Sequence, residues 1–288
     1  MTNAVEAVTG NAVRVRFGFR TDVGLKRRTN EDSVLAEPPV FLVADGMGGH
    51  EAGDRASAAV IAEFRVLLGT DPGPDDVVQA VDRAHRAVRV VAESTTRGAG
   101  STLTGVVLVT HEGRPHWLLV NVGDSRVYRL LGADLAQLTI DHSLVQELLD
   151  NGTLDRAGAA TFTKRNVITR AMGAEDSPAD FWLRPVVTGE RLLVCSDGLT
   201  GELSPEALRA AMTLNGDTQQ TADVLLGHAL GSGGRDNISV IIVDVVSGGE
   251  DPRESSTTTG FAATGTGASW TSDRASDDTA ELPGRGGR

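Results

Sequence analysis

Residues 40–46 read VFLVADG, an apolar run that ends directly in an aspartate and a glycine. Five consecutive apolar residues bounded by a turn signal are typical of a strand buried on both faces. Two other apolar runs end in the same way, 118–122 before Gly123-Asp124 and 192–195 before Ser196-Asp197-Gly198, and Asp236 precedes the run 238–243. A strand entering and a strand leaving can share one edge of an antiparallel sandwich. We therefore expect four carboxylates to converge there, those of Asp45, Asp124, Asp197 and Asp236.

The wider pattern of the chain indicates sheets covered by helices. Short runs rich in Val, Ile and Leu predict strands at 13–19, 40–44, 104–110, 117–122, 126–131, 191–195 and 238–246. Turn signals at 110–114 and 131–134 predict hairpins. Helical periodicity predicts long helices that begin near Asp54 and Asp75, and shorter ones at 143–149, 205–212 and 221–230. Hairpins with inserted helices favour an α+β fold of antiparallel sheets over a doubly wound parallel sheet.

Composition sets the limits of the folded part and the classes of partner. We expect a flexible N-terminus at 1–12, one domain at 13–246 and a disordered tail at 247–288, where half of the residues are Ser, Thr or Gly. The net charge of −12 argues against nucleic acid and against anionic membrane surfaces. A single cysteine, Cys195, excludes an intramolecular disulfide and fits a reducing compartment, so we expect a cytoplasmic protein.

The converging carboxylates predict a site for hard divalent cations. Buried carboxylates repel one another and raise each other's pKa unless a cation lies between them. Mg²⁺ and Mn²⁺ prefer carboxylate, carbonyl and water oxygens as ligands. A single Asp-Gly pair is most often a plain turn. The hypothesis therefore depends on four such positions together, each attached to an apolar run.

Six motifs, taken in order, resemble the PPM (PP2C-type) phosphatases, particularly the bacterial ones. They are TDVGLKRRTNED at 21–32, VADGMGGHEAG at 43–53, GSTLT at 100–104, VGDSRVY at 122–128, CSDGL at 195–199 and DNISVIIV at 236–243. Each alone is a weak signal, but the ordered set is specific and spans the predicted domain. The resemblance implies a four-layer α-β-β-α sandwich, with a variable flap at about 150–166.

The resemblance also implies roles for individual residues. Asp45 would bridge two metal ions, with Asp197 and Asp236 completing the shell of the first. The Gly46 carbonyl, Glu31 and Asp32 would serve the second ion, directly or through water, and Asp124 with Asp197 would hold a third, weaker one. Arg27 would bind the substrate phosphate, and Arg27, Asp45 and Asp32 would form the catalytic set. Met47 follows the Asp-Gly pair, so no histidine is assigned there as a general acid.

The activity implied is the hydrolysis of phosphoserine and phosphothreonine on proteins by a water that Mn²⁺ or Mg²⁺ activates. The expected partners are phosphorylated proteins, among them Ser/Thr kinases, and we expect a monomer that binds neither nucleic acid nor membrane. Two alternatives are a catalytically silent phosphoprotein-binding module and a phosphatase dedicated to one partner protein. A silent module would be expected to lose one of Asp45, Asp197 and Asp236, and all three are present.

Overall fold

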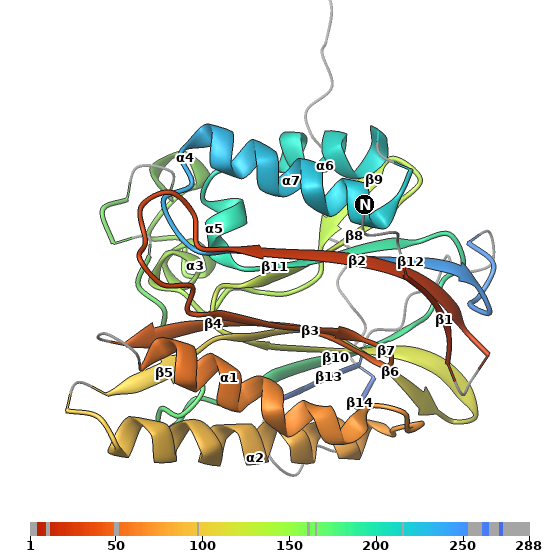
Figure 1. Cartoon of the computed structure of the whole chain (residues 1–288), viewed down its shortest axis with the longest axis horizontal. Coiled ribbons are helices and arrows are strands. Elements are labelled where there is room, and N and C mark those ends of the chain that lie inside the picture. The colour runs from red at the N-terminus through yellow and green to blue at the C-terminus, as the bar shows by residue number, and fades with distance from the viewer. Residues whose placement is uncertain are drawn as a thin grey trace, which may run out of the picture.

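The molecule has four layers in the order helix, sheet, sheet, helix (Figure 1). The computed structural model describes residues 5–9, 12–48, 52–96, 98–159, 162–164, 166–214, 216–252, 261–264 and 271–272. Within each sheet, neighbouring strands pair in antiparallel fashion. The α+β, four-layer fold expected from the sequence is therefore confirmed.

The first sheet combines two strands from the N-terminal region with four that follow residue 125. Its order is β1 (Val5–Val8), β2 (Arg14–Asp22), β12 (Ile238–Ser247), β11 (Arg191–Cys195), β8 (Arg126–Leu131) and β9 (Asp134–Gln137). The central strand β12 consists mainly of the β-branched residues Val and Ile and is buried over most of its length. Its pairing with β2 places Ile238 opposite Asp22 and thereby fixes where the strand begins.

The second sheet carries the segment with which the sequence analysis began. Its order is β14 (Thr271–Ser272), β13 (Phe261–Thr264), β10 (Asp180–Pro185), β7 (Arg114–Val122), β6 (Leu103–His111), β4 (Val40–Gly48) and β3 (Asp32–Glu37). The short strand β5 (Ala99–Ser101) pairs with the far end of β4. The run from Val40 to Ala44 is fully buried, because one face meets the other sheet and the opposite face meets helices.

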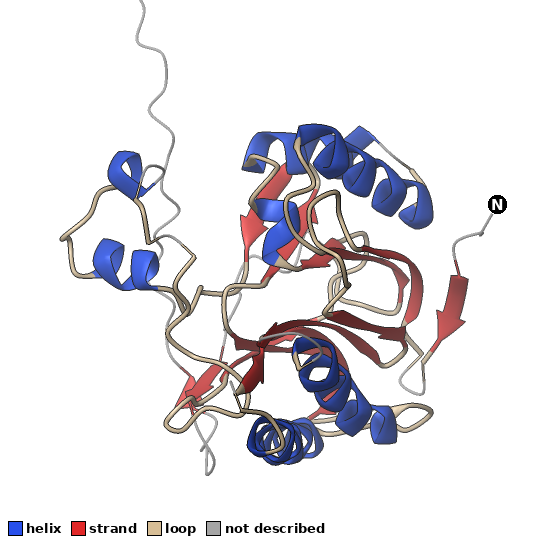
Figure 2. Ribbon diagram, turned by 60° about the vertical axis from the view of Figure 1, so that its left-hand side comes forward, coloured by secondary structure: helices blue, strands red, loops and turns tan. Residues whose placement is uncertain are grey.

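Helices cover the outer face of each sheet. The outer face of the second sheet packs against α1 (Gly53–Phe64) and α2 (Pro74–Glu93), whose apolar residues recur at helical spacing. The first sheet is covered by α5 (Asp197–Thr200), α6 (Pro205–Leu214) and α7 (Thr218–Ser232). The remaining helices, α3 (Leu144–Asp150) and α4 (Arg156–Ala159), stand clear of the sandwich (Figure 2). Among the described residues, no helix combines the length and the apolar character that crossing a bilayer requires.

Aromatic rings fill the space between the two sheets. Phe41 contacts Phe17 with ring centroids 5.4 Å apart and Trp117 with centroids 6.2 Å apart, both edge to face. Such pairs contribute about 0.5–1.5 kcal/mol each beyond the burial of their area. The indole Nε1 of Trp117 donates a hydrogen bond of 2.8 Å to the buried carboxylate of Glu190. The centre of the sandwich is thus tightly packed, and the polar chemistry lies at its edge.

The structure differs from the sequence predictions at several elements. The strands β3 and β10 were not predicted, because each is short and mixes charged residues with apolar ones. The first long helix ends at Phe64 and continues as a 3₁₀ turn over Arg65–Leu67. Within the segment expected to be flexible, β1 pairs with β2, and Glu6 forms ion pairs with Arg14 and Arg16.

Part of the segment 247–288, expected to be a disordered tail, is among the described residues. Strand β12 extends to Ser247, and β13 pairs with β10 at the edge of the second sheet. The rest of the predicted tail, 253–260, 265–270 and 273–288, lies outside the described residues. Within the predicted flap, residues 160, 161 and 165 also lie outside them.

Candidate metal and phosphate site

The structure places the four aspartates at strand ends, as the sequence predicts. Asp45 lies near the end of β4, Asp124 lies in the turn between β7 and β8, Asp197 opens α5, and Asp236 precedes β12 by two residues. The pKa of the Asp45 carboxyl is raised well above its ordinary value by burial and then by the charges of Asp32, Asp197, Asp124 and Asp236. All four other carboxylates are therefore close enough to act on Asp45 electrostatically.

Two glycines make this convergence sterically possible. A Cβ on Gly198 would lie 2.0 Å from the carbonyl oxygen of Asn237, and one on Gly46 would lie 2.1 Å from that of Gly53. A side chain at Gly198 would push α5 away from the start of β12, and one at Gly46 would push β4 away from the start of α1. Gly198 thus allows the backbone that carries Asp197 to approach the backbone that carries Asp236, and Gly46 allows β4 to approach the start of α1.

Burial and mutual repulsion raise the pKa of the other carboxyls in the site. The pKa of Asp32 is raised to about 6 by burial and by the charges of Asp197 and Asp236, although two hydroxyl groups act in the opposite direction. The pKa of Asp124 is raised to about 7 by burial and by Asp197 and Asp141. The pKa of Asp197 is likewise raised, by burial first and then by Asp236. The site therefore has an excess of negative charge that the protein does not neutralise.

Unpartnered oxygen atoms show what would complete the site. Asp32 Oδ1 and Asp197 Oδ1 are both buried and accept no hydrogen bond from the protein. Across the described residues, no group of three or more acidic, histidine or cysteine side chains is arranged so that it could hold a metal ion. Mg²⁺ usually keeps several waters and is bound through one or two carboxylates. The chemistry of this donor set, all oxygen atoms with two left open, therefore fits hard divalent cations.

Arg27 lies at the rim of the site and is bonded to one of the predicted ligands. Its Nη2 donates a hydrogen bond of 2.7 Å to Asp236 Oδ2, and the guanidinium is half exposed. Although its partial burial acts in the opposite direction, this bond and the charges of Asp236, Asp45 and Glu31 raise the pKa of Arg27. The sequence analysis assigned Arg27 to phosphate and Asp236 to metal, whereas the structure joins the two as an ion pair.

Glu31 and Asp32, at the start of β3, lie on opposite sides of the backbone. The carboxylate of Glu31 lies beside the start of α1, because a Cβ on Gly53 would be 2.8 Å from Glu31 Oε1. The Glu31 carbonyl accepts a hydrogen bond of 3.1 Å from Gly46 N, which attaches the β2–β3 loop to the Asp45-Gly46 segment of β4. Asp32 is the cross-strand partner of Asp45. The sequence-predicted ligands Glu31, Asp32, Asp45 and Gly46 are therefore one structural unit.

The sequence analysis missed Asn237, which holds the loop that carries Arg27. Its Oδ1 accepts a hydrogen bond of 2.9 Å from Glu31 N, and its Nδ2 donates to Val23 O at 3.0 Å and Thr29 O at 2.9 Å. The side chain is buried, so its three hydrogen bonds are formed away from water. Only the position directly after Asp236 could have marked it, and an asparagine there also fits an ordinary turn.

A second missed residue, His142, supports the turn that carries Asp124. Gly123 N donates to His142 Nδ1 at 3.2 Å, so Nδ1 is the acceptor and Nε2 carries the proton that reaches Asp180 Oδ2 at 3.0 Å. The backbone N–H of His142 also donates to Gly123 O at 2.9 Å. Arg170 Nη1 lies 2.9 Å from Asp180 Oδ1. No sequence spacing marks this histidine, because its partners are distant in the chain.

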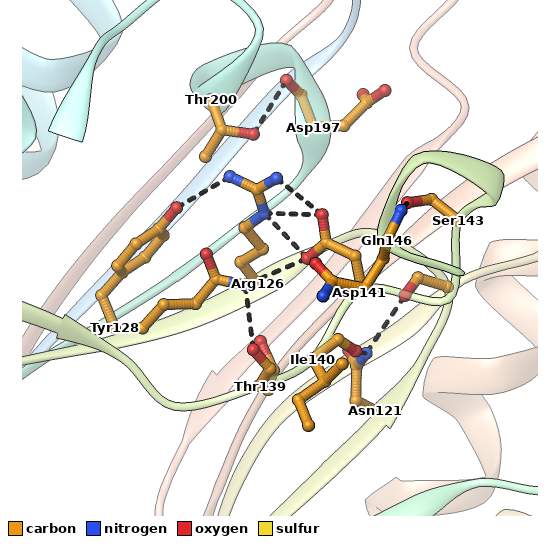
Figure 3. A network of polar contacts seen from close by, with 12 residues as sticks. Asn121, Arg126, Tyr128, Thr139, Ile140, Asp141, Ser143, Gln146, Asp197 and Thr200 are labelled. Atoms are coloured by element: carbon orange, nitrogen blue, oxygen red, sulfur yellow. Dashed lines mark hydrogen bonds and ion pairs between the residues drawn. The ribbon is translucent and has the colours of Figure 1, made fainter. Parts of the chain in front are cut away.

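Next to the acidic edge, Arg126 is held by a polar network (Figure 3). Its Nε and Nη2 donate to the Asp141 carboxylate at 2.9 Å and 2.6 Å, and its Nη1 donates to the Tyr128 hydroxyl at 3.0 Å. Despite its burial, Arg126 keeps a raised pKa because of the bonds to Asp141. The charge of Arg126 partly opposes the rise in the pKa of Asp124 and of Asp197. Its hydrogen-bond donors, however, are directed to Asp141 and Tyr128.

With the geometry established, the class of protein follows from comparison with known families. The family model described as Protein phosphatase 2C matches residues 28–225, which include every predicted metal ligand except Asp236. This match covers more than half of the chain. The chain therefore belongs to the protein phosphatase 2C family, and the resemblance seen in the six motifs is confirmed.

Individual relatives agree with this assignment. The chain is 37% identical over 238 residues to the Serine/threonine protein phosphatase PstP of Mycobacterium tuberculosis, covering 81% of this chain but only 45% of that protein. It is 34% identical over 241 residues to the Serine/threonine phosphatase stp of Listeria monocytogenes, covering 78% of this chain and 94% of that protein. This chain therefore spans less than half the length of PstP and nearly all of stp.

A solved structure of a relative has the same fold. The catalytic domain of PstP, in complex with two manganese ions, superposes with a TM-score of 0.74 at 34% sequence identity. The superposition covers 82% of this chain and 99% of that domain. The two proteins thus share the sandwich that forms the acidic edge.

Proposed function

We propose that this chain hydrolyses phosphoserine and phosphothreonine esters on proteins and depends on Mn²⁺ or Mg²⁺ for the reaction. The observation that carries the proposal is the pair of buried, unpartnered carboxylate oxygens, Asp32 Oδ1 and Asp197 Oδ1, in a site whose carboxyls have raised pKa values. Buried charges in proteins are usually paired or coordinate a metal ion, and these two oxygens have no partner in the protein. The named activity of the relatives and the manganese ions in the PstP structure support the same conclusion.

The residues that would hold two core ions are those gathered at the sandwich edge. Asp45 would serve both ions, Asp197 and Asp236 would complete the ligands of the first, and Glu31, Asp32 and the Gly46 carbonyl would serve the second. Asp124, with Asp197, would hold a third, weaker ion. When bound, such ions lower the pKa of coordinated water and neutralise the phosphate charge. The protein's own task is to present oxygens in a fixed arrangement and to orient the ester.

Arg27 is the group suited to orient the phosphate. Its planar guanidinium can bind two phosphate oxygens at once. In the structure its donor Nη2 is directed to Asp236, whose charge a cation would satisfy instead. With Asp236 serving a cation, Arg27 would be available to the substrate, and its half exposure leaves it accessible to a phosphorylated side chain. Arg27 would then stabilise the charge on the phosphoryl oxygens as the ester bond breaks.

Two alternatives make different predictions. A silent phosphoprotein-binding module would bind phosphopeptides and release no phosphate, but it has no need for the complete carboxylate set found here. A phosphatase dedicated to one partner would hydrolyse a small test ester and ignore unrelated phosphopeptides. We further propose that its substrates are proteins phosphorylated by Ser/Thr kinases, that the chain is a monomer and that it acts in the cytoplasm.

The decisive experiment uses the full chain stripped of metal with a chelator. We expect no hydrolysis of p-nitrophenyl phosphate until Mn²⁺ or Mg²⁺ is added, and then phosphate release from phosphothreonine peptides as well. Arg27→Ala should raise KM for both substrates, whereas Arg65→Ala, in the 3₁₀ turn after α1, should change nothing. Metal-independent hydrolysis, or folded protein that is inactive on ester and peptides with both ions, would refute the proposal.

A further inference from the structure

Asp32 is held by the hydroxyl groups of two serines to which the sequence analysis assigned no role. Its Oδ2 accepts hydrogen bonds from Ser196 Oγ at 2.9 Å and from Ser239 Oγ at 2.7 Å. Both serines are fully buried, Ser196 between β11 and α5 and Ser239 in β12. Asp32 belongs to the second sheet, whereas Ser239 belongs to the first sheet and Ser196 directly follows its strand β11, so these bonds join the two halves of the sandwich.

Backbone groups fix the direction of each bond. Ser239 N donates to Ser196 Oγ at 2.9 Å, so the only hydroxyl proton of Ser196 is left for Asp32. Asp32 N donates to Asn30 Oδ1 at 3.1 Å, which orients that amide so that its Nδ2 donates to Thr21 Oγ1 at 2.7 Å. Thr21 Oγ1 lies 2.9 Å from Ser239 Oγ and supplies its proton there, since Ser239 gives its own to Asp32.

The two oxygens of the Asp32 carboxylate therefore differ in their hydrogen bonding. Oδ2 receives two hydroxyl protons from donors that have no other acceptor in this network. Oδ1 is buried and receives none. Because the carboxylate cannot rotate without breaking both bonds to Oδ2, Oδ1 is kept in one position beside Asp45, the cross-strand partner of Asp32.

We propose that Ser196 and Ser239 are positioning residues, which hold Asp32 with Oδ1 directed at the cation site. The inference rests on the proposed metal-dependent activity and adds to it two residues that neither touch the substrate nor bind the ion. Partners that orient a ligating carboxylate typically contribute about 10- to 100-fold to metal affinity or activity. A merely structural role would instead be to join the two sheets, and the two roles can be separated experimentally.

The test compares Ser196→Ala and Ser239→Ala with a matched control. Thr104→Val removes a buried hydroxyl of the second sheet that has no hydrogen-bond partner, and it keeps the side-chain volume. Mn²⁺ binding to the metal-free full chain would be measured by titration calorimetry, and unfolding midpoints would be recorded without metal. We expect each serine variant to bind Mn²⁺ about 10-fold more weakly or worse, and the control to match the wild type.

A double-mutant cycle with Asp32→Ala separates positioning from sheet joining. If the serines act through Asp32, Ser239→Ala should change Mn²⁺ affinity less than about 2-fold once Asp32 is absent. Ser239→Thr keeps the hydroxyl and should restore most of the affinity. Equal losses with and without Asp32, or wild-type affinity in both serine variants, would overturn the inference. A wild-type chain that neither binds Mn²⁺ nor hydrolyses the ester would instead refute the proposed function, so the two failures are distinct.

Discussion

Asp32 and Asp45 lie directly opposite each other on the antiparallel strands β3 and β4. Like charges at such cross-strand positions destabilise a sheet. Burial makes the repulsion stronger, and burial is also the largest cause of the raised pKa of both carboxyls. The native sandwich therefore contains a repulsion that a divalent cation would remove.

The first prediction concerns the stability of the metal-free protein against pH. The pKa of Asp32 is raised to about 6 and that of Asp124 to about 7, from ordinary values of 3.8. Between these values the folded chain binds more protons than the unfolded chain, so stability is highest at the acidic end and falls as pH rises. We expect the contribution of these groups to decline between about pH 4 and pH 7.

Thermal unfolding in chelator, recorded in steps of pH, measures this decline. Saturating Mn²⁺ should abolish the part of the slope that arises in the site, because cation binding replaces protonation of the carboxyls. Asp32→Asn should flatten the metal-free profile as well. A metal-free stability that rises through the window from pH 5 to pH 7 would contradict the assigned direction of both shifts.

The second prediction concerns the ligands from the first sheet. Asp197→Ala and Asp236→Ala should each reduce metal-dependent turnover by more than about 100-fold, because loss of a ligand exceeds loss of an orienting partner. The fold should persist, since both changes remove repulsion. Asp223→Ala is the matched control, because Asp223 is an exposed aspartate on α7 that pairs with Arg20. Turnover and circular dichroism would be measured together, and near-normal turnover in either ligand variant would exclude that residue from the site.

The third prediction concerns Asn237. Asn237→Ala removes three buried hydrogen bonds to the β2–β3 loop and leaves Glu31 N without its partner. A lost buried partner costs about 1–3 kcal/mol, which a urea titration would measure. Because the loop carries Arg27, KM for a phosphopeptide should rise more than kcat falls. Asn151→Ala, in an exposed turn after α3, is the control, and an unchanged KM in Asn237→Ala would separate the loop from phosphate binding.

The fourth prediction concerns His142. His142→Ala deprives Asp180 and Gly123 N of their buried partners, so we expect a loss of about 1–3 kcal/mol in the free energy of unfolding. Asp124 should then be less well fixed, and the concentration of Mn²⁺ needed for half-maximal activity should rise. His111→Ala, at the β6–β7 turn, should leave both quantities unchanged. An identical metal requirement in the two variants would show that His142 has no influence on the site.

The sequence was sufficient to predict the strands that contain Asp45 or lie next to Asp197 and Asp236, because each is rich in Val, Ile or Leu and meets an aspartate at or near one end. It did not predict β3, since Asp32 and Glu37 interrupt the apolar pattern of that strand. Nor did it predict Asn237, His142, Ser196 or Ser239 as parts of the site. Their roles depend on partners brought together only by the tertiary fold, as in the contact of His142 with Asp180 from another strand.

The two sheets contribute different parts of the acidic edge: Asp32 and Asp45 belong to the second, Asp197 and Asp236 lie next to strands of the first, and Asp124 lies where the chain passes from β7 to β8. Neither sheet alone has a complete set of oxygens. Any partially folded species in which the two sheets have separated would therefore not bind the metal, however much native secondary structure it retained. Ion affinity therefore reports whether the two sheets are packed together. During refolding, activity should appear only after the two sheets have packed against each other.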